Sequence, residues 1–173
     1  MFHRRPIAIN STPKYQSGFT FLELLIAVLV IAIAMLGYAR LQVGALQQAR
    51  EARFSQLAYN AMLDLSDRIR SEATAARNGE FTFDNLSSGA APSANNCTTN
   101  SCSRSEFAQF ELQEWFNWYS DASRVPALRF QVAQPESNLI TIQLRWDPTL
   151  SGVTECSDDG QAAQCVEMEL WMR

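Results

Sequence analysis

The chain has 173 residues and a mass of 19.4 kDa, which suggests one domain with a modest core and one long element. Its formal charge is −4 and 18% of its residues are charged, so it lacks the broad basic field that non-specific nucleic-acid binding needs. Hydrophobic residues make up 47% of the chain, which argues against disorder. The one histidine, His3, lies in a segment that we expect to be removed. Histidine-based acid–base catalysis, a Ser–His triad and a Cys–His dyad are therefore not expected, and we predict neither an enzyme nor a bound cofactor.

The character of the chain changes abruptly after Gly18. Residues 1–18 are polar and weakly basic, with two prolines that interrupt any helix. Phe19–Ala39 is then an apolar run with a single charge, Glu23, and as a helix it would span the ~30 Å hydrocarbon core of a bilayer. A secretory signal peptide has a shorter apolar run with a small-residue cleavage site after it, whereas here the conspicuous small residue comes before the run. Cleavage after Gly18 would leave the apolar segment on the mature protein.

Glu23 is unusual because it lies within an apolar segment. A carboxylate costs about 2–3 kcal/mol near the centre of a bilayer and less near its surface. Cleavage after Gly18 would create a new α-amino group on Phe19, four residues upstream, and the positive end of a helix dipole also favours a carboxylate there. One interpretation is that Glu23 pairs with the terminal amine of a neighbouring copy and sets the register of helix packing. The alternative is an interfacial glutamate that merely tolerates its position near the headgroups.

The residues Gly18-Phe19-Thr20-Phe21-Leu22-Glu23, followed directly by the apolar run, carry a family resemblance. They resemble the processing and assembly signal of type IV pilins and of type II secretion pseudopilins. The resemblance implies that a prepilin peptidase cuts between Gly18 and Phe19, that Phe19 becomes N-methylated, and that Glu23 recognises the N-terminus of an adjacent subunit. One departure is Arg40, where major pilins commonly carry a proline.

Helical periodicity continues beyond the apolar run. Between residues 54 and 69 the apolar side chains recur at helical spacing and form one stripe, and no proline occurs between Lys14 and Ala91. Asn78-Gly79 is a helix stop signal. We therefore predict one helix from about Phe19 to Arg77, whose amphipathic second half packs on a head domain through Phe54, Leu57, Ala58, Ala61, Leu65 and Ile69.

The rest of the chain predicts a small α+β head. Asn85–Asn100 has the composition of a loop, and the capping-box pattern Ser103-x-x-Glu106 begins a helix to about Tyr119. The apolar face of this helix would be Ala108, Leu112, Trp115, Phe116 and Tyr119.

Three segments alternate between apolar and polar residues, as half-buried strands do. They are Ala127–Ala133, Leu139–Trp146 and Val166–Met172, and Gln134–Asn138 would form the turn between the first two. The predicted fold class is α+β, a long N-terminal helix with a membrane-spanning half and an amphipathic half, packed on a small antiparallel sheet. The resemblance implies the same type IV pilin-like fold. The predicted organisation is a cytoplasmic leader that is cleaved (1–18), a transmembrane and assembly helix (19–40), the amphipathic half of that helix (41–79) and a globular head (80–173).

Four cysteines fall into two local pairs, Cys97 with Cys102 and Cys156 with Cys165. Neither pair has the C-x-x-C spacing typical of a zinc knuckle, and a head outside the cytosol would meet oxidising conditions. Three disulfide connectivities are possible, of which the two local ones are the simplest. Each small closed loop would add about 2–3 kcal/mol to stability.

Ser157–Gly160 contains Asp158 and Asp159 and could be read as part of a calcium loop. Its spacing lacks a full ligand set, so a solvated turn is favoured, and no metal site is predicted.

Three features of the head resemble the PilV subgroup of minor pilins. They are a cysteine pair before a helix that contains Trp115, a strand that ends in Trp146-Asp147, and a late cysteine pair. This implies a structural subunit that primes or joins a type IV pilus, in pilus assembly with adhesion or twitching motility. The implied partners are the prepilin peptidase, other major and minor pilins, the inner-membrane assembly machinery and the membrane itself.

The implied location is the inner membrane, single-pass with the head in the periplasm, and later the extracellular fibre. Loss of the leader removes three basic residues and takes the charge from −4 to −7, so no nucleic-acid partner is expected. The alternatives are a minor pseudopilin of type II secretion and, from another class, a tip adhesin or binding module.

Overall fold

The computed structural model describes residues 18–152, 155–156 and 163–172. The chain divides into two compact units, of which the first ends at Gly44 and the second is Ala45–Arg173. Helix α1, Phe21–Ser71, runs through the boundary and contributes residues to both units. In the first unit the described residues from Phe21 onward are all helical.

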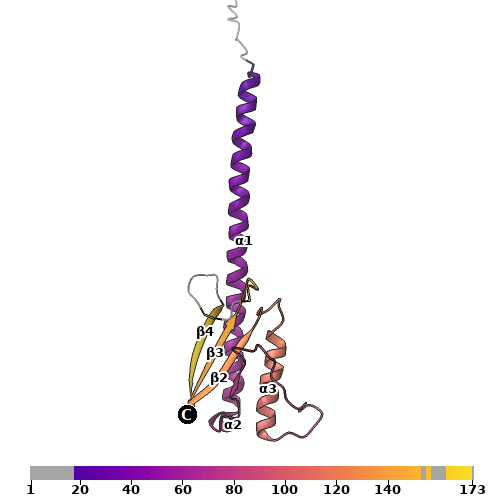
Figure 1. Cartoon of the computed structure of the whole chain (residues 1–173), viewed down its shortest axis with the longest axis vertical. Helices are drawn as coiled ribbons and strands as arrows, with labels where there is room; N and C mark the ends of the chain where they lie inside the picture. Colours follow the sequence, from indigo (N-terminus) through magenta and orange to yellow (C-terminus); the bar gives the residue numbers. More distant parts are fainter. Residues whose placement is uncertain (1–17, 153–154, 157–162, 173) are drawn as a thin grey trace, which may run out of the picture. The chain divides into compact units, whose positions relative to one another are not determined.

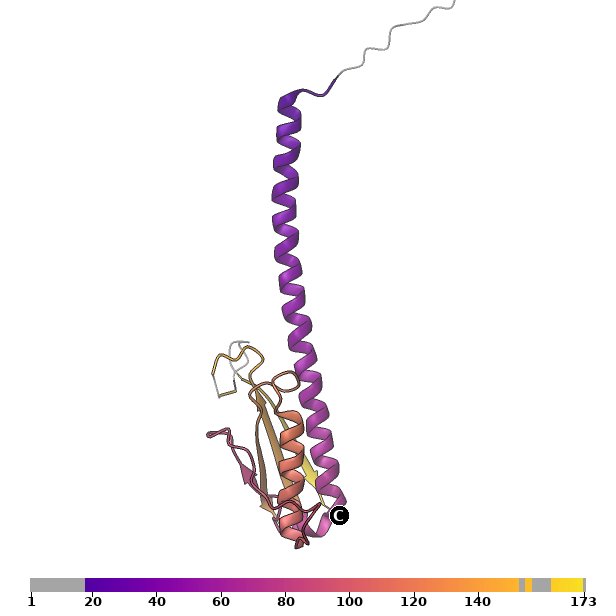
Figure 2. The same ribbon diagram turned by 90° about the vertical axis from the view of Figure 1, so that its right-hand side faces the viewer.

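The second unit is a four-stranded antiparallel sheet with helices on one side (Figure 1). The sheet has the order β1-β2-β3-β4, so each strand pairs with its neighbour in the sequence. The strands are Phe83–Asp84 (β1), Arg129–Glu136 (β2), Leu139–Trp146 (β3) and Gln164–Trp171 (β4). The later part of α1 lies alongside α3, Arg104–Tyr119 (Figure 2). The short helix α2, Ala73–Arg77, connects α1 to the sheet. This confirms the predicted fold class, a long N-terminal helix packed on a small antiparallel sheet.

The prediction of one unbroken helix to Arg77 is wrong at Glu72. α1 ends at Ser71, and Glu72 has φ −110° and ψ 52°, outside the helical region, before α2 begins. The change of direction lets Ala75 and Ala76 turn into the core, where both are buried. No local sequence signal marks this break, because Glu72 is itself a good helix former.

The predicted stop at Asn78-Gly79 is confirmed. Gly79 has φ +76°, the left-handed conformation that glycine adopts at little cost. Its N–H donates to the Ala76 carbonyl at 3.1 Å, and the Glu80 N–H donates to the Ala75 carbonyl at 3.0 Å. This pair of bonds satisfies carbonyls that a helix end would otherwise leave unpaired.

The capping box that was expected before α3 is also present. The Ser103 hydroxyl accepts from the Glu106 N–H at 3.3 Å, and the Ser103 N–H donates to the Glu106 carboxylate at 2.8 Å. On the predicted apolar face the first four residues are buried and Tyr119 is half-buried. The buried four are Ala108, Leu112, Trp115 and Phe116.

The strands match the expected alternation, and both ends of β2 and of β4 differ from the expected bounds Ala127–Ala133 and Val166–Met172. β3 is Leu139–Trp146, as predicted, and β4 is Gln164–Trp171. β2 is Arg129–Glu136, so the expected turn at Gln134–Asn138 shrinks to Ser137 and Asn138. Pro135 is tolerated in β2 because the register between Ala133 and Glu136 is irregular and a bulge needs fewer ladder bonds.

The fourth strand, β1, was not predicted. It has only two residues, Phe83 and Asp84, which pair with Val132 and Gln131 of β2. Asn85 extends this edge: its N–H donates to the Phe130 carbonyl at 3.1 Å, and its side-chain oxygen accepts from the Phe130 N–H at 2.7 Å. A two-residue strand has too few residues to show a period, so the sequence could not reveal it.

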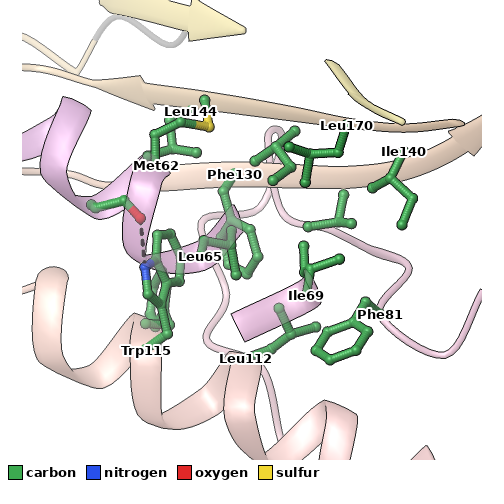
Figure 3. Packing of buried hydrophobic residues seen from close by; sticks show 14 of the residues in the cluster. Met62, Leu65, Ile69, Phe81, Leu112, Trp115, Phe130, Ile140, Leu144 and Leu170 are labelled. Atoms are coloured by element: carbon green, nitrogen blue, oxygen red, sulfur yellow. Dashed lines mark hydrogen bonds between the residues drawn. The ribbon is translucent and has the colours of Figure 1, made fainter. Parts of the chain in front are cut away.

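One core joins α1, α3 and the sheet (Figure 3). Trp115 of α3 is fully buried and packs edge-on against Phe130 of β2, with ring centroids 4.8 Å apart. Its indole N–H donates to the Ala61 carbonyl of α1 at 2.9 Å. Arg68 of α1 adds an ion pair to Glu111 of α3 at 2.6 Å. From the facing sides come Met62, Leu65, Ile69, Leu112, Ile140, Leu144 and Leu170.

A buried carboxylate organises the loop after β3. Asp147 is 3% exposed. One of its oxygens accepts from the N–H and hydroxyl of Thr149 at 3.0 and 2.8 Å, and the other accepts from the Ser151 hydroxyl at 3.1 Å and the Gly152 N–H at 2.9 Å. Burial, the strongest influence, acts to raise the pKa of Asp147, but these hydrogen bonds together outweigh it and the pKa lies below its ordinary value. The loop therefore depends on a charged Asp147.

We expect Trp115→Phe to lower the free energy of unfolding by about 2 kcal/mol. The substitution removes the hydrogen bond to Ala61 and leaves a small cavity. Trp118→Phe is the matched control, because Trp118 is 59% exposed and should change stability by less than about 0.5 kcal/mol. Urea unfolding of the Ala45–Arg173 unit measures both. Equal losses for the two variants would contradict this account of the core.

We expect Asp147→Asn to lower the free energy of unfolding at pH 7 by about 2 kcal/mol, because an amide group meets donors where a carboxylate accepts. The folded pKa is lowered, so the stabilisation by wild-type Asp147 is present above the unfolded-chain pKa of ~3.9 and is lost as the pH falls through the folded value. The gap between wild type and variant should therefore narrow below about pH 4. Urea unfolding at pH 7 and at pH 3 measures this gap.

The control for this prediction is Asp67→Asn, because the side chain of Asp67 is 78% exposed. A gap between wild type and Asp147→Asn that stays constant with pH, or a loss no larger than that of the control, would count against a charged, loop-organising Asp147.

Candidate assembly site at the start of the first helix

The predicted processing and assembly residues lie together at the start of α1. Gly18 and Phe19 precede the helix, and Glu23 lies in its first turn. Thr20 caps this end: its carbonyl accepts from the Glu23 N–H at 3.0 Å and from the Leu24 N–H at 3.3 Å, and its hydroxyl lies 3.4 Å from the Glu23 nitrogen. The helix therefore starts at once after the predicted cut, with its free N–H groups satisfied in part by Thr20.

The first unit exposes an apolar helix surface on all sides. Each large apolar side chain there is more than half exposed, from 51% at Leu25 to 87% at Phe19. Within the described residues one helix, α1, is long and apolar enough to cross a membrane. Its apolar part is the segment that belongs to the first unit. Burying one such side chain is worth about 1.5–3 kcal/mol, so this surface needs lipid or other chains around it. Its members include Phe21, Leu22, Ile26, Leu29, Ile33, Leu36, Leu41 and Val43.

Within the described residues the Glu23 carboxylate makes no ion pair. The next charged side chain along α1 is Arg40, seventeen residues on, which the helical rise places about 25 Å away. Glu23 is exposed and sits on an otherwise apolar helix. Any cation that pairs with Glu23 would therefore have to come from outside the described helix.

Gly18 has open space around it in the described structure. A Cβ built there would meet no other atom within 4 Å. The fold does not require glycine at this position, so a requirement for glycine would come from a molecule that acts on the chain.

The four cysteines form the two local disulfides, Cys97–Cys102 and Cys156–Cys165. Their Cα atoms are 5.6 and 5.8 Å apart, as a disulfide allows. The first closes the loop before α3, and the second joins the segment before β4 to its second residue. The described cysteines thus have structural roles and leave no thiol free.

The possible calcium loop, Ser157–Gly160 with Asp158 and Asp159, lies outside the described residues. In the part of the chain that is described, no group of three or more His, Cys, Asp or Glu side chains is placed to hold a metal ion.

Comparison with known proteins matches the same short region. Residues 13–39 match the family model described as the prokaryotic N-terminal methylation motif. No curated protein and no solved structure matches significantly. The matched residues contain Gly18, Phe19 and Glu23 and most of the exposed apolar run. The match supports a type IV pilin-like or pseudopilin protein, and the motif implies processing by a prepilin peptidase.

Proposed function

We propose that this protein is a structural subunit of a type IV pilus, made as a prepilin that is cut between Gly18 and Phe19 and methylated on Phe19. The observation that carries the proposal is the methylation motif at residues 13–39, which includes the start of a helix that is apolar and exposed on all sides. If processing removed this helix, the mature protein would not have this apolar surface. Cleavage before the helix keeps it for anchoring and assembly.

Assembly on this proposal exchanges lipid for neighbouring helices around the first part of α1. The exchange changes little apolar area, because lipid tails are as apolar as leucine. Polar groups then decide which arrangement is stable. A pair between Glu23 and the α-amino group of Phe19 in the next subunit would remove a charge that is costly in an apolar environment, and it would fix the register of neighbouring helices.

The proposed organisation follows the order of the chain. Residues 1–18 form the cytoplasmic leader, 19–40 the membrane-spanning assembly helix, 41–79 its amphipathic continuation and 80–173 the head. The head would lie in the periplasm before assembly and in the extracellular fibre afterwards. The two disulfides support this orientation, because such bonds persist in oxidising compartments.

Within the pilin family we propose a minor pilin of the PilV type. The support is the disulfide before α3, the buried Trp115 on that helix, the strand that ends in Trp146-Asp147 and the disulfide near the C-terminus. A minor pseudopilin of type II secretion shares the N-terminal motif and is the alternative. Mass spectrometry of sheared surface fibres separates the two: the protein is present in pili on our proposal and absent from them if it serves the secretion system.

We expect Gly18→Arg to block processing, because a bulky cation would occupy the position beside the cut bond. The substitution should leave the fold unchanged, since a side chain at Gly18 meets open space. Intact-mass measurement of the membrane-bound protein gives the answer: the variant keeps its leader, whereas wild type loses it and gains one methyl group. Gln16→Arg adds the same charge two residues earlier and is the control. Cleavage of Gly18→Arg at residue 18 would contradict the proposed site.

We expect Glu23→Ala to be inserted and cleaved normally and to be incorporated into pili at least about tenfold less than wild type, the factor that ~1.4 kcal/mol of lost pairing produces. Glu23→Gln keeps the shape and removes the charge, so it should fail to the same degree. Quantitative mass spectrometry of sheared pili measures incorporation, with the membrane fraction as the reference for expression. Wild-type incorporation of either variant would show that Glu23 is only an interfacial residue.

A further inference from the structure

We infer that the loop Asp147–Gly152 is a docking element that presents Leu150 to the apolar N-terminal helix of a neighbouring subunit. The inference rests on the proposed function and adds a contact made by the head, at a position that the methylation motif does not include.

Leu150 combines two unfavourable properties. Its side chain is 60% exposed, and its φ is 55°, in the left-handed region where the Cβ of an L-residue approaches the carbonyl oxygen too closely. Glycine or asparagine fits such a position at less cost. Because most of the side chain is exposed, burial within its own chain does not offset this strain. Strain of this kind persists where the surroundings enforce it and is found most often at functional sites.

The surroundings of Leu150 do enforce its conformation. The Leu150 N–H donates to the Asp147 carbonyl at 3.3 Å. The residues on both sides are tied to the Asp147 carboxylate, Thr149 at 2.8 and 3.0 Å and Gly152 at 2.9 Å. The Asp147 N–H in turn donates to the Pro126 carbonyl at 3.0 Å, which fixes the loop to the head. The exposed leucine is thus held in place before any partner arrives.

Other exposed apolar side chains of the second unit do not share this feature. Tyr59 and Leu63 are in α1, Trp118 is in α3 and Trp171 ends β4. Among the described non-glycine residues, positive φ occurs at Leu150 and at Ala127. Of these two, only Leu150 carries a large apolar side chain.

The loop lies beside α1 where the exposed apolar run ends. Pro148 and Thr149 line a hollow of about 380 Å³ together with Gln47, Arg50 and Glu51 of α1. Leu46, which directly precedes Gln47, is 71% exposed. An exposed apolar side chain of α1 therefore lies next to the hollow that the loop lines.

The chemistry of Leu150 requires an apolar partner, and a second subunit carries one. The large apolar side chains of the first unit are each more than half exposed and form an apolar surface on all sides of the helix. Contact with Leu150 would extend the interface that assembly already buries. A lipid surface is the other apolar partner, and the test below separates the two.

The first test compares Leu150→Gly with Ala127→Gly in the full chain. Both substitutions relieve a positive φ, but only the first removes a large exposed apolar side chain. We expect both variants to unfold at the wild-type midpoint temperature or above it. We expect Leu150→Gly alone to enter sheared pili several-fold less than wild type. Wild-type incorporation of Leu150→Gly, or an equal loss in Ala127→Gly, overturns the inference.

The second test places a photo-crosslinking phenylalanine derivative at Leu150 of the full chain in cells. A cross-link to the N-terminal helix of another pilin subunit, identified by peptide mass spectrometry, supports the inference. A cross-link to phospholipid alone, or no cross-link, overturns it. This result decides the matter if Leu150→Gly unexpectedly lowers the midpoint temperature.

Wild-type protein in the same preparations distinguishes the two levels of proposal. If wild type keeps its leader or is absent from fibres, the proposed function fails and the docking contact fails with it. Suppose instead that wild type is processed and present in pili, but that Leu150→Gly enters pili as wild type does and position 150 gives no cross-link to another subunit. The docking contact alone is then wrong.

Discussion

The apolar surface of the first part of α1 is the constraint on which the rest depends. Its large side chains are more than half exposed, and Glu23, the one charge of Phe19–Ala39, has no ion-pair partner among the described residues. Water is therefore excluded as its working solvent. Because lipid and a bundle of similar helices bury this surface about equally well, apolar area explains why the segment is kept in a membrane or a bundle. On the proposed function the segment passes from the membrane into a bundle. Apolar area does not explain this passage, so polar groups at the start of the helix would have to decide it.

In the second unit the same helix buries apolar side chains within its own chain. From Phe54 onward, α1 buries one stripe against α3 and the sheet, and the core closes without any side chain from the first unit. The Trp115 bond to the Ala61 carbonyl and the Arg68–Glu111 ion pair fix α3 to this half of α1. The sequence marks the transition through periodicity: an unbroken apolar run becomes an apolar stripe.

Features with a local cause could be predicted from the sequence, and those with a distant cause could not. The capping box of α3, the Gly79 stop and the alternation of β3 each depend on residues within a few positions of one another. The break at Glu72 serves the burial of Ala75 and Ala76 in a core assembled from distant segments. At the assembly site, the motif fixes where Gly18, Phe19 and Glu23 lie. On the proposed function their partners belong to other molecules, so neither the sequence nor a single chain can supply that geometry.

Asn85 and Asp147 are buried polar side chains that hold loops in place. The residue type at each position follows from the hydrogen-bond donors and acceptors that face it. Asn85 accepts from the Phe130 N–H at 2.7 Å and donates to the Ala90 carbonyl at 2.8 Å, so it needs an amide, which can do both. Asp147 faces only donors, from Thr149, Ser151 and Gly152, so a carboxylate suits it and an amide would oppose one donor with another. In the sequence, Asn85 reads as the start of a loop and Asp147 as a polar residue after a predicted strand. Only the fold shows that Asn85 pairs with a strand edge and that Asp147 holds the exposed Leu150 in its unusual conformation.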